Sequence, residues 1–199
     1  MSRPPDQFST AQKVLHWTIA VIVFIMVPVG LTMANVLGDG PFKNILYELH
    51  KSFGIIIFCL AVVRVCIRLA RGAPPLVPGL PAWQRAAAHA SHYALYLLIV
   101  LVPIAGWAGT SACCAPVNVF WTVPVTLPLP DSMDLAKQIF RVHDTLALTL
   151  AAIVLVHASA ALHHHFVRRD ATLLRMLPRS TSGDRIRREV HVPDRARGA

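Results

Sequence analysis

Histidines are the residues of this sequence that are best placed to do chemistry. Ten occur among 199 residues, and six of them lie in or beside long apolar segments: His16, His50, His89, His92, His143 and His157. Ionisable side chains at membrane depth are costly and usually face the interior of a helix bundle, where they serve a function. One such histidine is often only a packed core residue, but a set at matched positions indicates ligand binding.

The stretch HDTLALTLAAIVLVH places a histidine at each end of an apolar run. A helix rises ~21 Å over these 14 residues and turns back to within about 40° of its starting direction, so His143 and His157 share one face. Each would lie ~5–7 Å inside one boundary of a bilayer. Neutral imidazole is a standard axial ligand of haem iron, and an electron-transfer haem takes a protein ligand on both sides. The pattern therefore predicts two stacked haems, each needing a second histidine.

The composition predicts helices that cross a membrane. Hydrophobic residues make up 55% of the chain and charged residues only 15%, whereas soluble domains have about 25% charged residues. Four apolar segments reach the ~20 residues that a membrane-spanning helix needs; they lie at about 14–36, 45–69, 86–111 and 139–163. Strands would alternate polar and apolar residues, and these segments do not. We expect an all-α, integral membrane four-helix bundle.

The positive charge is a topology signal and does not indicate a nucleic-acid partner. The net charge is +9, and most of it lies before the first span, in the 68–85 connection and in the C-terminal tail. With four spans these regions share one side of the membrane, and the positive-inside rule makes both termini cytoplasmic. We expect one membrane domain over residues 8–179. Residues 180–199 form a basic tail without apolar periodicity, which we expect to be disordered and to contact membrane lipid.

The topology supplies a partner for each histidine of the fourth span. His50 begins the second span at its outer end, at the depth of His143. His16 lies near the inner end of the first span, at the depth of His157. His92, in the third span, is about as deep as His157, so these residues alone leave open which histidine is the second inner ligand.

Four segments together resemble the bacterial cytochrome b561 family. They are VLHW in the first span, HKSFGIIIFCLAVVRVCIRL in the second, HASHYALYLL in the third and LVHASAALHHHFVRRDATLLRMLP after the fourth. The resemblance covers roughly residues 8 to 179. It implies a multi-pass protein of the bacterial inner membrane that passes electrons through two b-type haems between a periplasmic donor and the ubiquinone pool. It also favours His16, His50, His143 and His157 as the haem ligands.

Other residues fit roles around such haems, each with a simpler alternative. Arg64 and Arg68 share one helix face and could pair with haem propionates or with lipid phosphate. His164 lies seven residues beyond His157, so together with His92 it could hydrogen-bond a quinone carbonyl or relay protons. The triple histidine that contains it could instead bind adventitious metal or face headgroups.

The outer face has cations that could attract a donor. Lys51 follows His50 directly and Arg141 precedes His143 by two residues. Both could draw a small anionic donor toward the outer haem, although a lysine at a membrane boundary often only extends toward the headgroups.

Two hypotheses of function follow. The first is a superoxide:ubiquinone oxidoreductase, because one branch of the family oxidises superoxide. The second is a relay subunit that anchors a partner redox protein, a dehydrogenase or hydrogenase. The chain has no Rossmann fingerprint and no iron–sulfur cysteine pattern, so nicotinamide or cluster chemistry would belong to that partner. A histidine-lined metal transporter fits less well, because the paired depths suit two haems better than one continuous path.

Four cysteines add little to either hypothesis. Cys59 and Cys66 lie within the second span, where a thiol packs as a small hydrophobe. Cys113 and Cys114 are adjacent, and neighbouring cysteines rarely form an unstrained disulfide with each other.

Overall fold

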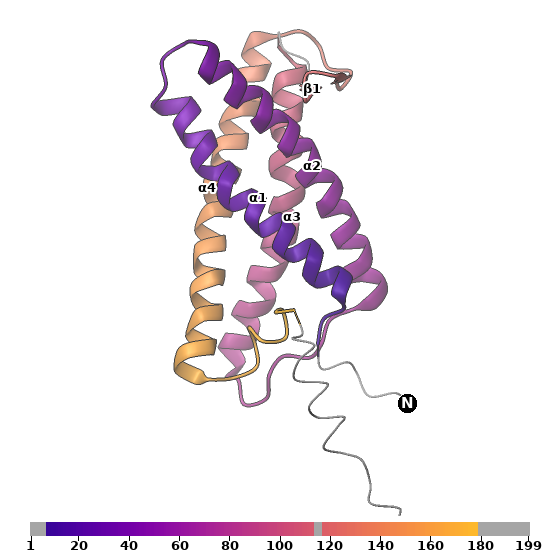
Figure 1. Ribbon diagram of the computed structural model, residues 1–199, viewed down its shortest axis with the longest axis vertical. Coiled ribbons are helices and arrows are strands. Elements are labelled where there is room, and N and C mark those ends of the chain that lie inside the picture. The colour runs from indigo at the N-terminus through magenta and orange to yellow at the C-terminus, as the bar shows by residue number, and fades with distance from the viewer. Residues whose placement is uncertain (1–6, 114–116, 179–199) are drawn as a thin grey trace, which may run out of the picture.

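Four long helices form an up-and-down bundle in the computed structural model, which describes residues 7–113 and 117–178 (Figure 1). They are α1 (Thr10–Asn35), α2 (Pro41–Arg71), α3 (Ala82–Ser111) and α4 (Met133–His163). Each is long and apolar enough to cross a membrane. The predicted all-α, four-span architecture is confirmed. The basic tail and Cys114 lie outside the described residues.

Each helix begins before the apolar segment that predicted it, because polar residues start its first turn. Ser9 caps α1: its Oγ accepts a hydrogen bond from the Gln12 backbone N–H, and the Gln12 side chain accepts one from the Ser9 N–H. Ser132 caps α4 with a single bond, its Oγ accepting from the Leu135 N–H. Pro41 opens α2, where a missing N–H costs nothing. Hydropathy detects the apolar part of a helix and misses such starts.

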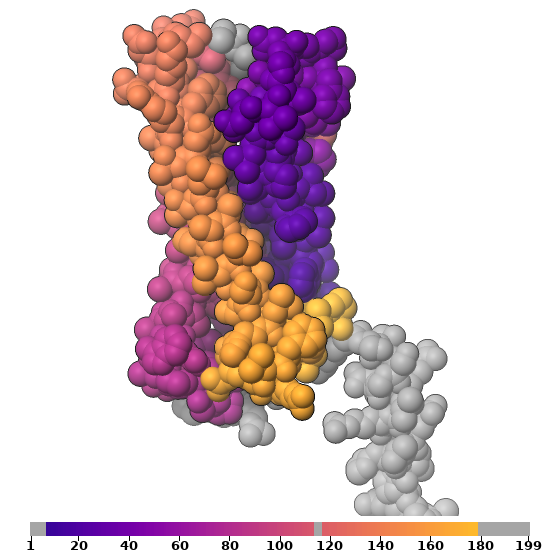
Figure 2. Space-filling model, turned by 90° about the vertical axis from the view of Figure 1, so that its left-hand side faces the viewer, coloured from indigo at the N-terminus to yellow at the C-terminus, as the bar shows by residue number. Residues whose placement is uncertain are grey.

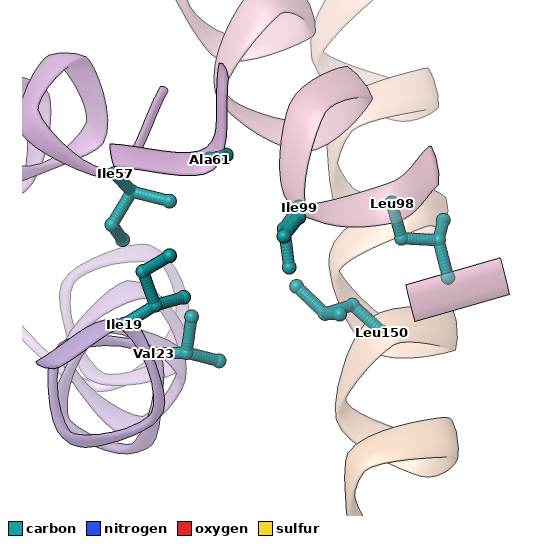
Figure 3. Close-up of a cluster of buried hydrophobic side chains, with 7 residues drawn as sticks. All are labelled: Ile19, Val23, Ile57, Ala61, Leu98, Ile99 and Leu150. Atoms are coloured by element: carbon teal, nitrogen blue, oxygen red, sulfur yellow. The ribbon is translucent and has the colours of Figure 1, made fainter. Parts of the chain in front are cut away.

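The helices pack in sequence around a central apolar cluster. The most extensive pairings are α3 with α4, α1 with α2 and α2 with α3, whereas α1 and α4 touch little. Seven buried side chains from all four helices meet midway along the bundle (Figure 3): Ile19, Val23, Ile57, Ala61, Leu98, Ile99 and Leu150. Leu150 lies seven residues from both His143 and His157 on α4. The cluster therefore separates the two ends of the bundle where these histidines lie.

The connection between α3 and α4 contains a short hairpin. Strand β1 (Val117–Val119) pairs antiparallel with β2 (Val123–Val125) and lies against α2. Ser52, fully buried on α2, accepts a hydrogen bond at Oγ from the Phe120 N–H at 2.8 Å. The sequence did not predict this hairpin, because its strands are only three residues each and β2 contains a proline. We call the end of the bundle that carries this hairpin the outer end.

At the opposite, inner end the chain folds back across the bundle after α4. A single π-helical turn, η1 (His164–Arg168), follows α4 directly. Residues 164–178, here called the inner cap, then reach α1, where the Trp17 indole N–H donates to the Met176 carbonyl and Lys13 Nζ to the Leu177 carbonyl, both at 2.9 Å. Figure 2 shows the cap in yellow and orange below α4, extending toward the indigo foot of α1. The cap thus adds contacts between α1 and α4, which touch little directly.

Candidate functional site

The four histidines singled out from the sequence form two pairs. His16 on α1 faces His157 on α4 with ring centroids 6.4 Å apart. His50 on α2 faces His143 on α4 with centroids 6.3 Å apart. Within each pair the ring planes are steeply inclined, at 74° and 79°. We call His16 and His157 the inner pair, and we call His50 and His143 the outer pair. The central apolar cluster lies between the two pairs.

This separation fits a metal ion between the two rings of each pair. An ion bound about 2 Å from one nitrogen of each imidazole holds the ring centres roughly 6 Å apart. Within residues 7–113 and 117–178 no group of three or more histidine, cysteine or acidic side chains could hold a bare ion. Two protein ligands on opposite sides suit an iron whose remaining ligands come from a porphyrin. The donor set therefore fits haem.

The outer pair is oriented by backbone and by two glycines. The His143 Nδ1–H donates to the Val102 carbonyl of α3 at 2.9 Å, which leaves Nε2 with a free lone pair. Gly106 lies against the same ring, and a Cβ there would be 3.0 Å from Nδ1 and Cε1 of His143. Gly30 on α1 lies against the His50 ring in the same way, and a Cβ there would be 3.2 Å from His50 Cε1. Both glycines therefore provide the room that the rings occupy.

The inner pair has a third histidine and a cation beside it. The His92 ring centroid is 5.4 Å from that of His157, closer than the His16–His157 separation. Arg64 Nη2 lies 3.2 Å from His16 Nδ1, and its Nη1 donates to the Gln12 carbonyl at 2.8 Å. His92 is therefore a neighbour of the inner pair, and the 6.4 Å spacing favours His16 as the partner of His157.

Two arginines line the inner pair on α2. The Arg64 guanidinium carbon lies 5.5 Å from the centre of the Tyr96 ring. Arg68 lies one turn further along the same face, and its Nη1 is buried without a hydrogen-bond partner. A buried guanidinium N–H without a partner is costly, and a carboxylate is the group it binds best. The two side chains therefore suit the propionate groups of a haem.

His164 lies in the inner cap and is paired with an acid. Its Nδ1 is 2.6 Å from Asp170 Oδ2. Partial burial alone would raise the pKa of Asp170, but hydrogen bonds from Thr172 and His164 outweigh it and lower that pKa to about 2. Among the described contacts of His164, none joins it to His92, although the sequence suggested that the two act together.

The cations predicted at the outer end differ in their surroundings. Lys51 forms an ion pair with Glu48, and its side chain is only 11% exposed. Arg141 and Lys137 are exposed on α4 and line an open hollow of about 410 Å³ together with Phe140 and Asp144. The charge of Lys51 is thus neutralised within the fold, whereas the positive charges of Arg141 and Lys137 lie at the surface.

Sequence reasoning missed the groups that hold the histidines. Gly30, Gly106 and the Val102 carbonyl contact imidazole rings from helices far away in sequence. A glycine inside an apolar span is a weak sign of close approach, and it was the only signal available. Nothing in a sequence marks one backbone carbonyl as an acceptor.

The sequence of the chain matches one protein family and several of its known members. Residues 7–179 match the family described as prokaryotic cytochrome b561. The chain is 34% identical over 178 residues to "Cytochrome b561 homolog 2" of Escherichia coli (strain K12), covering 89% of this chain and 95% of that protein. It is 30% identical over 175 residues to "Probable superoxide oxidase CybB" of Yersinia pestis, covering 87% and 97%. "Cytochrome b562" of Cereibacter sphaeroides is 29% identical over 185 residues, covering 89% and 98%.

Proposed function

The chain belongs to the prokaryotic cytochrome b561 family, and from this membership we propose that it carries electrons from a donor at the outer end, through two b-type haems, to ubiquinone at the inner end. Family membership makes the chain a bacterial membrane protein and a b-type cytochrome that transfers electrons across the membrane. The number of haems, the ligands, the donor, the acceptor and the cytoplasmic location of both termini belong to the proposal.

The observation that carries the proposal is the presence of two histidine pairs with nearly equal spacing. Centroid separations of 6.4 and 6.3 Å support one iron between His16 and His157 and another between His50 and His143. Bound haem supplies a one-electron centre that alternates between ferric and ferrous iron. The apolar cluster lies in the space that separates the two centres. The chain can therefore work as a fixed electron path.

At the inner end, the side chains of this chain would bind and orient a haem and a quinone. Arg64 and Arg68 offer guanidinium groups to propionates. His92 lies beside the inner pair and can donate a hydrogen bond to a quinone carbonyl, while His164, held by Asp170 in the inner cap, is the second candidate for that contact or for proton delivery. The cap is held to α1 by the hydrogen bonds of Lys13 and Trp17.

At the outer end we propose a small anionic donor, with superoxide as the most concrete candidate. The Yersinia pestis relative is named a probable superoxide oxidase. Arg141 and Lys137 outnumber the one acid of their hollow, Asp144, and lie near His143 on the same helix. Local positive potential speeds the encounter with an anion. Lys51 contributes less, because Glu48 pairs with it.

Haem analysis of the purified protein tests the cofactor assignment. We expect two haems per chain with low-spin spectra. His50→Ala and His143→Ala should lose mainly one haem, and His16→Ala and His157→Ala mainly the other. A single haem per chain, or loss of an axial ligand in His92→Ala with none in His16→Ala, would contradict the assignment.

Pulsed superoxide tests the donor. We expect rapid haem reduction whose bimolecular rate falls with ionic strength, because the attraction is screened over about 10 Å at 0.1 M salt. Arg141→Glu should slow it, and Arg85→Glu, an exposed site at the inner end, should not. If superoxide leaves the haems oxidised, the donor is a docked redox protein and the chain is a relay subunit.

A further inference from the structure

We propose that the inner cap positions His16 opposite His157, and that Lys13 and Trp17, which bind the cap from α1, are positioning residues for the inner haem. The two helices that carry the inner pair, α1 and α4, touch little directly. The cap follows α4 and reaches α1 through these two side chains. The role rests on the proposed function, because it concerns the haem assigned to the inner pair.

Hydrogen bonds within the cap make it a folded segment. His164 Nδ1 lies 2.6 Å from Asp170 Oδ2, and Asp170 Oδ1 accepts a hydrogen bond from the Thr172 backbone N–H at 2.9 Å. Further along, the Met176 N–H donates to the Leu173 carbonyl at 2.9 Å. These bonds fix the direction of the chain after α4, so the end of the cap has a defined place relative to that helix.

Two arginines attach the cap to parts of the bundle other than α1. Arg168 Nη1 donates to Gln84 Oε1 on α3 at 2.9 Å. Arg175 Nη1 donates to the Pro75 carbonyl, in the connection between α2 and α3. The cap is therefore held independently of α1 and can act as a support against which α1 is placed.

Lys13 and Trp17 bind this support from the turns of α1 on either side of His16. Residues four apart lie on one face of a helix, and here they donate to the Leu177 and Met176 carbonyls, each at 2.9 Å. Lys13 is only 7% exposed, and a buried ammonium group is costly without hydrogen-bond acceptors. The Trp17 ring also packs edge-on against the His16 ring, with centroids 5.2 Å apart. The cap thus favours one placement of His16.

The outer pair is held by different contacts. His143 is oriented by the Val102 carbonyl of α3, and α3 and α4 form the most extensive helix pairing of the bundle. Loss of the contacts between the cap and α1 should therefore disturb the inner pair and leave the outer pair in place.

Haem release from two single-haem backgrounds tests this difference without any turnover. His50→Ala should keep the inner haem and His157→Ala the outer one. Each detergent-purified holoprotein is mixed with excess apomyoglobin, which captures released haem. Trp17→Phe keeps an aromatic ring but removes the indole N–H. It should speed release from the His50→Ala background by roughly 2- to 12-fold, the equivalent of one hydrogen bond, and leave release from the His157→Ala background unchanged. Trp83→Phe is the matched control, because Trp83 is an exposed tryptophan at the inner end of α3.

Lys13 provides a second measurement for the case in which Trp17→Phe fails to fold or to bind haem. Lys13→Met removes the donor at similar length, and Lys13→Arg keeps one. In the chain with all four paired histidines, Lys13→Met should shift the low-spin ferric EPR signal of one haem, because that signal depends on how the two axial imidazoles are oriented. Lys13→Arg should restore the signal, whereas a general loosening of the fold would alter both haems.

Haem content is measured first in every sample, which separates the two levels of inference. A wild-type protein without two haems refutes the proposed function. The positioning role alone is wrong if the protein holds two haems and Trp17→Phe and Lys13→Met change neither, or change both equally. An effect of Trp83→Phe as large as that of Trp17→Phe also overturns it.

Discussion

Gly106 offers a sharp test of how the outer pair is held. A Cβ at this position would lie 3.0 Å from Nδ1 and Cε1 of the His143 ring, inside ordinary van der Waals contact. The ring cannot stay in place when Gly106 is changed to alanine, and its hydrogen bond to the Val102 carbonyl must lengthen or break. The expected result is a displaced ligand at the outer site and an unchanged inner site.

The magnitude follows from two opposing effects. Alanine in place of glycine inside a helix stabilises it by up to about 1 kcal/mol, and overpacking a filled site costs about 1–3 kcal/mol. Gly54→Ala, on α2, isolates the first effect, because a Cβ there meets nothing within 4 Å. The difference between the two variants should therefore be about 1–3 kcal/mol, or roughly 5- to 150-fold in the equilibrium constant for binding the outer haem.

Haem titration of the two purified variants, followed by absorbance and by protein-normalised haem content, measures this difference. Gly106→Ala should bind the second haem more weakly than Gly54→Ala, and both should bind the first haem alike. If the two variants bind both haems equally, the close contact at Gly106 does not position His143, and the account of the outer pair fails.

Three further changes test other parts of the fold. Leu150→Ala, in the central cluster, should lower the free energy of unfolding by about 2–5 kcal/mol with both haems retained, as thermal melts and pyridine haemochrome spectra would show. Ser52→Ala removes the acceptor for the Phe120 N–H and should loosen the hairpin by about 1 kcal/mol, seen as faster amide exchange there. The carboxylate of Asp170 stabilises the inner cap above the ordinary pKa of 3.8, and this contribution is lost as the pH falls through about 2. Asp170→Asn should therefore make the cap more sensitive to limited proteolysis at neutral pH, and the excess over wild type should vanish in strong acid; an equal sensitivity at neutral pH would contradict the pairing with His164.

The architecture and the histidine pairs followed from the sequence because they depend on local and periodic properties. Four apolar segments of spanning length predict four helices whatever their packing. The 14-residue spacing of His143 and His157 places both on one face of α4, and the alternating direction of the spans brings His50 to one end and His16 to the other. These predictions need only helix geometry and chain direction, so they did not depend on side-chain detail.

Tertiary structure alone decided what surrounds each pair. Only the packing shows how close His16 and His92 lie to His157, with ring centroids 6.4 and 5.4 Å away. The carbonyl at His143 and the guanidinium at His16 come from other helices, 41 and 48 residues away in sequence. Such contacts are set by the rotation and tilt of packed helices, which depend on all their side chains at once, and no local pattern in the sequence encodes them.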